Sequence, residues 1–145
     1  MICAVHAVIG AVVGRLAKNR PTAFVAGVST HLLGDLIPHK DFDPKIEAPL
    51  LAATLGYLAW RYGINSPEFI GAFGGIAPDL ENAAQVVGLI SPDQMVFPTH
   101  QGMHHHGPPV TSTLPQGVLA AACVWFLLQS DLEKRKCSDC GRNNG

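Results

Sequence analysis

Residues 110–130 read VTSTLPQGVLAAACVWFLLQS, a run of 21 positions without a charged side chain. The second half of the run is almost entirely apolar, and it lacks the alternation of polar and apolar residues that is typical of a strand. Its length meets the usual requirement of about 20 apolar residues for a helix that crosses a membrane, although Pro115 interrupts its beginning. The run therefore predicts an apolar helix that is able to span a bilayer.

Four further apolar segments precede this run, and helix-breaking residues separate them. The breaks lie at Arg20-Pro21, at Pro38 with the turn of residues 41–44, at residues 63–67, and in a loop of residues 91–109. Pro21 suits the first turn of a helix, and Ser66 is expected to cap the next-to-last one. The pattern predicts an all-α fold in which about five helices form a compact, membrane-embedded bundle.

The chain is expected to form one domain. No linker divides residues 1–130, which we interpret as a single helical, multi-pass membrane domain. Residues 131–145 are polar, and we expect them to form a flexible tail. The hydrophobic share of 48% excludes intrinsic disorder of the whole chain.

The charge content limits the classes of partner. Only 14% of the residues are charged, against about 25% in an ordinary soluble domain, so the chain has few groups with which to cover a surface in water. Membrane lipid is therefore an expected partner. The net charge of −1 excludes a nucleic-acid-binding protein that neutralises phosphates.

The basic residues predict an orientation in the inner, cytoplasmic membrane. With five spans and a cytoplasmic C-terminus, eight of the ten Lys and Arg residues fall on the cytoplasmic side and two, Lys40 and Lys45, on the outer side. The eight are Arg15, Lys18, Arg20, Arg61, Lys134, Arg135, Lys136 and Arg142. Several apolar segments are short for a span, so a soluble or half-embedded bundle stays open as an alternative.

Histidine and aspartate residues form a pattern that is typical of metal ligands. His31 and Asp35 are four residues apart, which places both side chains on one face of a helix. Asp79 lies within an apolar segment, where a carboxylate is costly unless it is paired or bound to a metal. Imidazole and carboxylate ligands suit Zn²⁺, with Mn²⁺ or Fe²⁺ as alternatives. The predicted ligands of a divalent metal, most suitably Zn²⁺, are His6, His31, Asp35, His39, Asp79, His100 and His105.

Each of these residues also has an interpretation without a metal. His6 could be a core histidine, and His31 with Asp35 could form a simple hydrogen bond within one helix. Asp79 could cap a helix after Pro78. The histidines of residues 100–106 could lie on an exposed polar loop. The metal site is favoured because the five-span topology brings most of these residues to one side.

The same residues resemble a known family. The segments are VHAVIG at residues 5–10, STHLLGDLIPH at residues 29–39, GIAPDLE at residues 75–81, and HQGMHHH at residues 100–106. Together they resemble small helical membrane proteins related to the inner-membrane metal-dependent hydrolases, and more distantly zinc-dependent phospholipase C. The chain departs from that pattern at Glu81, Gln101 and His104, where the hydrolase motifs carry Asp, Arg and Thr.

The expected activity follows from such a site. A metal ion held by these ligands would acidify a bound water for attack on a phosphodiester or another ester, which we expect to be lipid-linked. Glu81 or His104 is expected to accept and return the proton. Two alternatives stay open: a non-catalytic integral membrane protein that binds metal, and a helical bundle that has no metal site.

Overall fold

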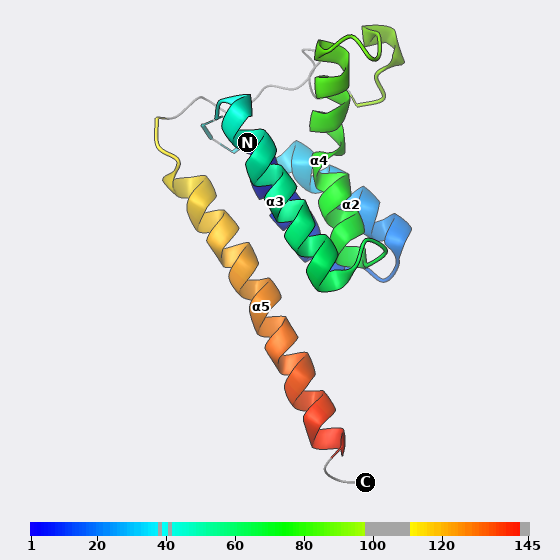
Figure 1. The fold of residues 1–145 in the computed structure, drawn as a ribbon, viewed down its shortest axis with the longest axis vertical. Helices are drawn as coiled ribbons and strands as arrows, with labels where there is room; N and C mark the ends of the chain where they lie inside the picture. The colour runs from blue at the N-terminus through cyan, green and yellow to red at the C-terminus, as the bar shows by residue number, and fades with distance from the viewer. Residues whose placement is uncertain (38, 41, 98–110, 143–145) are drawn as a thin grey trace.

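The computed structural model describes residues 1–37, 39–40, 42–97 and 111–142, and for residues 133–142 it describes the backbone alone. These residues form five α-helices and one short 3-10 helix, and none of them lies in a strand. The elements are α1 (Cys3–Leu16), α2 (Arg20–Gly34), α3 (Pro44–Tyr62), α4 (Pro67–Val86), η1 (Pro92–Gln94) and α5 (Leu114–Arg142). The predicted all-α bundle of about five helices is thus confirmed (Figure 1).

Local sequence signals set the ends of the helices. The side chain of Asn19 accepts a hydrogen bond from the amide of Thr22 at 2.9 Å and caps α2, and Pro21 occupies its first turn, as predicted. Ser66 caps α4 through the amide of Phe69 at 3.0 Å, also as predicted. Helix α3 ends at Tyr62, and the φ of 85° at its C-cap residue, Gly63, lies in the region that favours glycine.

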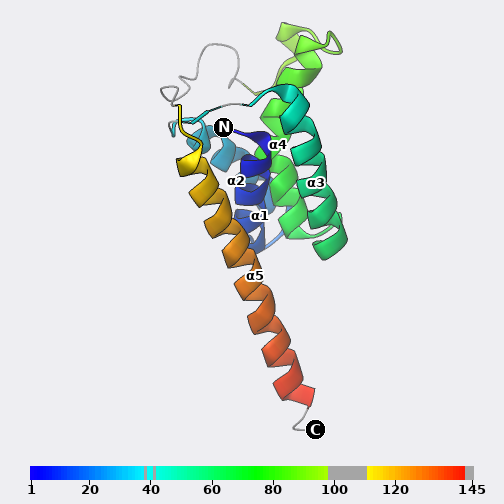
Figure 2. The same ribbon diagram turned by 60° about the vertical axis from the view of Figure 1, so that its left-hand side comes forward.

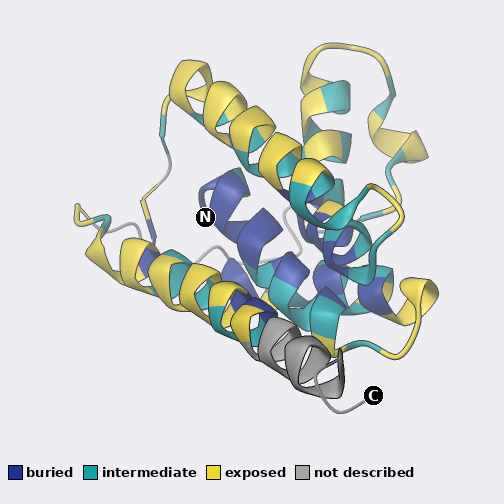
Figure 3. Cartoon of the chain, turned by 60° about the horizontal axis from the view of Figure 1, so that its bottom comes forward, coloured by how far each residue is buried: buried dark blue, intermediate teal, exposed yellow. Residues whose placement is uncertain are grey.

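Helix α1 lies at the centre of the bundle, and the other four helices pack against it (Figure 2). Its buried residues include alanine, valine and glycine on all sides of the helix. In contrast, Leu58 is the only residue of α3 that is fully buried, and most residues of α5 between 114 and 132 are exposed (Figure 3). Helices α1, α2 and α4 pack most closely, and the main apolar core lies where α1 and α4 meet Leu58 of α3 and Leu127 of α5.

The structure bears on two predictions, the flexible C-terminal tail and the membrane-spanning helix. The segment from residue 131, expected to be a flexible tail, begins inside α5, which continues to Arg142 and extends past the other helices in Figures 1 and 2. Within the part of the chain that the structure describes, we find no helix that combines the length and the apolarity needed to cross a membrane.

Glycines allow the backbones of α1, α2 and α4 to approach closely. A Cβ atom on Gly71 of α4 would lie 2.2 Å from the carbonyl oxygen of Gly10 in α1, and one on Gly27 of α2 would lie 2.2 Å from the carbonyl oxygen of Gly71. Real Cβ atoms cannot occupy such positions. The three helices therefore keep this spacing because glycine stands at each crossing.

Replacing Gly71 with alanine is expected to lower the free energy of unfolding by about 1–3 kcal/mol, as overpacking of a tight core does. The atoms in the way are backbone atoms of α1, which cannot move without shifting the helix. Gly56→Ala is the matched control, because a Cβ there meets nothing within 4 Å. We expect Gly56→Ala to raise the free energy of unfolding by about 0.5–1 kcal/mol, because alanine has a higher helix propensity than glycine. Urea unfolding measures both, and equal stabilities would contradict the close approach.

A network of charged side chains joins α1, α3, α4 and α5. Asp131 of α5 accepts hydrogen bonds from Arg15 at 2.7 Å, from Arg61 at 2.7 Å and from the hydroxyl of Tyr62 at 3.0 Å. Arg15 also donates to Glu68 at 3.0 Å and to Ser130. Arg15 and Arg61, which the predicted orientation counts on the cytoplasmic side, thus both pair with Asp131, and the orientation itself stays a prediction.

Candidate metal centre

Three of the predicted ligands come together between the central helices. His6 is on α1, His31 is in the last turn of α2, and Asp79 is in the middle of α4. One ligand atom of each lies within 4.8 Å of those of the other two. Residues from three different helices thus form a group with the chemistry of a divalent-metal site.

Asp35 connects the two histidines. It is the C-cap residue of α2, one turn after His31, and its Oδ2 lies 3.3 Å from His31 Nε2. Its Oδ1 lies 3.0 Å from His6 Nε2 and 3.1 Å from the amino nitrogen of Met1. The predicted pairing of His31 with Asp35 is therefore observed, and Asp35 contacts His6 as well.

Asp79 completes the group from α4. Its Oδ1 lies 3.8 Å from His31 Nε2, and the rings of His6 and His31 stack with centroids 4.1 Å apart. Pro78 and Asp79 both lie inside α4, so Asp79 does not cap a helix, which was one of its alternative interpretations. The carboxylate instead faces an imidazole of another helix.

Two glycines make this approach of the helices possible. A Cβ atom on Gly34 would lie 3.0 Å from Cε1 of His6, and one on Gly75 would lie 2.5 Å from the carbonyl oxygen of His6. The carbonyl of Gly75 accepts a hydrogen bond from His31 Nδ1 at 2.8 Å. Pro78 follows three residues later and has no amide hydrogen, so the helical hydrogen bonding of α4 is interrupted nearby. The packing of backbones therefore places His6, His31 and α4 in contact.

The charges of the site follow from its pKa shifts. Burial favours the neutral form of Asp35, but hydrogen bonds from His31 and His6 outweigh burial, and the pKa of Asp35 lies well below its usual range. Burial lowers the pKa of His6. Burial acts in the same direction on His31, but its hydrogen bond to Asp35 and the charge of Asp79 raise the pKa of His31 overall. Without a metal, the site is thus an ionised Asp35 beside a neutral His6 and a readily protonated His31.

The hydrogen bonds leave one nitrogen of each imidazole suited to a cation. His31 donates through Nδ1 to the carbonyl of Gly75, so in the neutral ring Nε2 carries the lone pair. His6 donates through Nε2 to the ionised Asp35, so its Nδ1 carries the lone pair. That Nδ1 atom is buried and has no hydrogen-bond partner among the described residues. A backbone carbonyl and a carboxylate are the usual partners that orient metal-binding histidines, so these residues fit a divalent metal.

Burial determines from which side the site is reached. The side chains of His6 and His31 are 1% and 0% exposed, whereas that of Asp79 is 18% exposed. A ligand or substrate would therefore approach along the Asp79 side.

The sequence reasoning missed two residues beside the group. The thiol of Cys3 lies 3.3 Å from Oε2 of Glu47, and burial and the negative charges of Asp79 and Glu47 raise the pKa of Cys3. Cys3 precedes His6 by three residues, which places both side chains on one face of α1. This spacing is a sequence signal from which the position of Cys3 near the site could have been predicted. Glu47 has no comparable signal, because it comes from the separate helix α3.

The structure does not bring the other described candidates into the group. His39 is buried, and its Nδ1 lies 2.7 Å from the carbonyl of Ile37. Both carboxylate oxygens of Glu81, predicted to transfer protons, accept hydrogen bonds from the amides of Val96 and Phe97 at 2.6 and 2.8 Å. Glu81 thus anchors the segment after η1. The predicted ligands His100 and His105 and the predicted catalytic residue His104 lie outside the described residues.

Comparison of the chain with protein-family models, with curated proteins and with solved structures finds no match. The resemblance to the membrane metal-dependent hydrolases therefore stays a prediction from the sequence motifs. The function has to be argued from the chemistry of the site.

Proposed function

We propose that the protein is a metal-dependent hydrolase that binds one divalent cation through His6, His31 and Asp79. The observation that carries the proposal is the hydrogen bond from His31 Nδ1 to the carbonyl of Gly75, together with the approach of His31 Nε2 to Asp79. This arrangement selects the tautomer of His31 in which Nε2 is able to bind a metal. Two imidazoles and a carboxylate suit Zn²⁺.

The residues of the chain have distinct roles in this proposal. His6, His31 and Asp79 would hold the cation, Asp35 would orient His6 through Nε2, and the carbonyl of Gly75 would orient His31 through Nδ1. When bound, the cation supplies Lewis acidity, which lowers the pKa of a water molecule and offsets negative charge on a phosphoryl or carbonyl oxygen. The partial exposure of Asp79 provides the route for an ester or phosphodiester.

A lipid-linked substrate is part of the proposal, because large apolar side chains are exposed on the flanking helices. Trp60 of α3 is 80% exposed and Trp125 of α5 is 65% exposed, among several leucine and valine residues. Exposed tryptophan is common where proteins contact the interface of a membrane. We propose that these faces hold the protein at a lipid surface.

A second candidate function is a metal-binding protein without catalysis. It is favoured by the nearly complete burial of His6 and His31, which is typical of structural metal sites. The two functions share the ligands and differ in whether a substrate reaches the cation.

Hydrolysis assays of the zinc-loaded protein separate the two functions. We expect cleavage of bis(p-nitrophenyl) phosphate, p-nitrophenyl butyrate or a short-chain phospholipid, and a loss of at least about 100-fold in kcat in Asp79→Asn, since a charged ligand is removed. His39→Ala removes a histidine that the structure does not place in the group, and it should keep the activity. No turnover with one equivalent of zinc bound, or unchanged turnover in Asp79→Asn, would contradict the hydrolase and favour the structural metal.

A further inference from the structure

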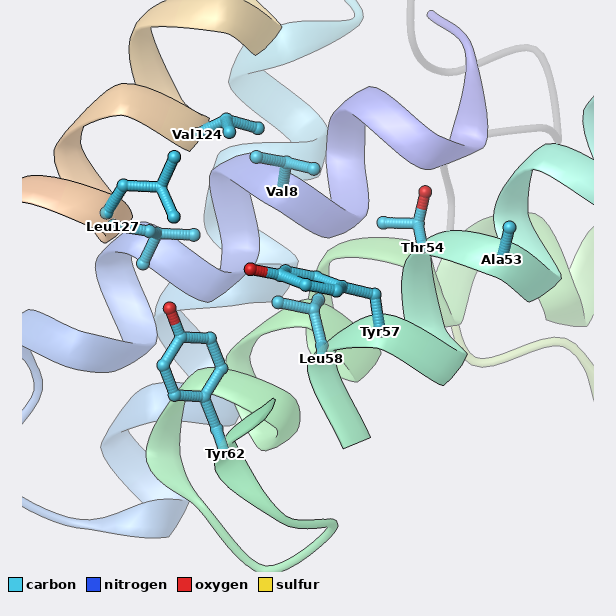
Figure 4. A pocket seen from close by; sticks show the side chains of 9 residues that line it. Val8, Ala53, Thr54, Tyr57, Leu58, Tyr62, Val124 and Leu127 are labelled. Atoms are coloured by element: carbon cyan, nitrogen blue, oxygen red, sulfur yellow. The ribbon is translucent and has the colours of Figure 1, made fainter. Parts of the chain in front are cut away.

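A cavity lies on the other side of α1, away from the candidate metal centre. It has a volume of about 330 Å³ and lies between α3 and α5, with Val8 of α1, Leu58 of α3 and Leu127 of α5 among its lining residues (Figure 4). Val8 follows His6 by two residues, so the two side chains leave different faces of the helix. The cavity and the metal centre are therefore separate places in the fold.

The cavity exists because α3 and α5 each pack against α1, while their own backbones come close at few positions. Leu58 and Leu127 are 2% and 4% exposed and form its floor, whereas Tyr57 and Leu128 are 44% exposed at its rim. In Figure 4 the ring of Tyr57 extends from α3 towards α1 and α5. The volume falls in the range of small-molecule sites, about 300–1,000 Å³, and the mostly apolar lining suits an apolar ligand.

One end of this cavity is charged. Leu128 also lines a second hollow of about 290 Å³, together with Leu132, Arg61 and Asp131. The hydrogen bonds from Arg61 and Tyr62 to Asp131 connect α3 to α5 at this end. The groove formed by the two cavities, which we call the α3–α5 groove, is thus apolar along its length and polar at one end.

The hydrogen bonds at the polar end select the charge of a ligand. Asp131 accepts from Arg15, Arg61 and Tyr62, so most of its acceptor capacity is used. Arg61 is 27% exposed, and its hydrogen bond to Asp131 uses one of the five N–H donors of a guanidinium group. An incoming group therefore meets donors that are available and a carboxylate that is already occupied, which favours an anion.

We propose that the α3–α5 groove binds a single-chain carboxylate amphiphile, a medium-chain fatty acid, with its alkyl chain in the apolar cavity and its carboxylate at Arg61. This site does not depend on the metal centre or on hydrolysis. Its ligand buries the apolar surface that α3 and α5 leave uncovered, and the charge of Arg61 sets the direction in which the chain lies.

Calorimetric titration with decanoate and with 1-decanol, both below their aggregation concentrations, tests the proposal. Ala53 is exposed and lines the apolar cavity, so Ala53→Trp is expected to fill it and to weaken binding of both compounds at least about tenfold. Ala52→Trp is the matched control, because Ala52 is exposed on the same helix and does not line the cavity. It should bind both compounds as the wild type does.

Arg61→Gln tests the polar end. We expect it to weaken binding of decanoate about tenfold, the loss of a charge-assisted hydrogen bond, and to leave decanol binding unchanged. Retained decanol binding also shows that the variant is folded. Absence of decanoate binding to the wild type, or equal binding to Ala53→Trp and Ala52→Trp, would overturn the site. Equal losses for decanoate and decanol in Arg61→Gln would overturn the placement of the carboxylate.

Discussion

Replacing His31 with alanine is expected to lower the affinity for Zn²⁺ by at least about 100-fold, since even residues that only orient a ligand contribute about 10–100-fold. His31 offers Nε2 between Asp35 and Asp79, and its other nitrogen is held by the carbonyl of Gly75. The wild-type protein should bind one equivalent of zinc in this centre, measured by competition with a chelator. Its thermal unfolding should move to lower temperature when the zinc is removed.

Matched variants show whether zinc binds at this centre or at other histidines of the chain. His39→Ala removes an imidazole that contacts the carbonyl of Ile37, and it should leave zinc affinity unchanged. Asp79→Asn changes few atoms at a partly exposed position, so it should weaken zinc binding while the circular dichroism of the protein stays the same. A variant with alanine at residues 104–106 tests the histidine run. If that variant loses the zinc and His31→Ala keeps it, the proposed centre is wrong.

Asp131→Asn is expected to lower the free energy of unfolding by about 3 kcal/mol, the lower end of the range for a broken buried ion pair. Asp131 is 10% exposed and accepts hydrogen bonds from Arg15, Arg61 and Tyr62, so the change leaves two guanidinium groups without their shared carboxylate. The lower end applies because Arg61 is 27% exposed and water can solvate it. Chemical denaturation measures the loss. Asp93→Asn, at a fully exposed position in η1, should lose much less stability, because water solvates the groups around it.

The pH dependence of this difference gives an independent check. Burial would raise the pKa of Asp131, but hydrogen bonds from Arg15 and Tyr62 outweigh burial and lower it. A lowered pKa in the folded state stabilises the fold above the pKa of the unfolded state, about 3.9, and this stabilisation is lost as the pH falls further. The difference between wild type and Asp131→Asn should therefore be constant above about pH 5 and shrink below about pH 4. A difference that grows on acidification would contradict the network.

Features that depend on neighbouring residues could be predicted from the sequence. Pro21 and Ser66 mark the starts of α2 and α4, because a missing amide and a capping hydroxyl act within one turn of a helix. His31 and Asp35 meet because residues four apart lie on one face of a helix. Asp79 was predicted to have a partner because an apolar segment cannot leave a carboxylate alone, and the structure places it near His31.

Other features could not be predicted, because they depend on which helix faces meet. The hydrogen bond of His31 to the carbonyl of Gly75 requires α2 and α4 to approach closely, and the sequence does not say which glycines cross. Glu81 was predicted to transfer protons, yet it binds the amides of Val96 and Phe97, fifteen and sixteen residues later. Arg15 of α1 and Arg61 of α3 share Asp131 of α5, a contact that depends on how three helices pack.

The sequence by itself determined the five helices, the starts of α2 and α4, and the kind of residues that a metal site would use. These features follow from helical geometry and from the cost of an isolated charge, which act over a few residues. Only the tertiary structure decided that Asp35 contacts His6, that Cys3 and Glu47 lie beside the group, and that a groove opens between α3 and α5. The physical reason is that close packing selects neighbours by the shape of whole helix faces, and shape depends on residues far apart in the chain.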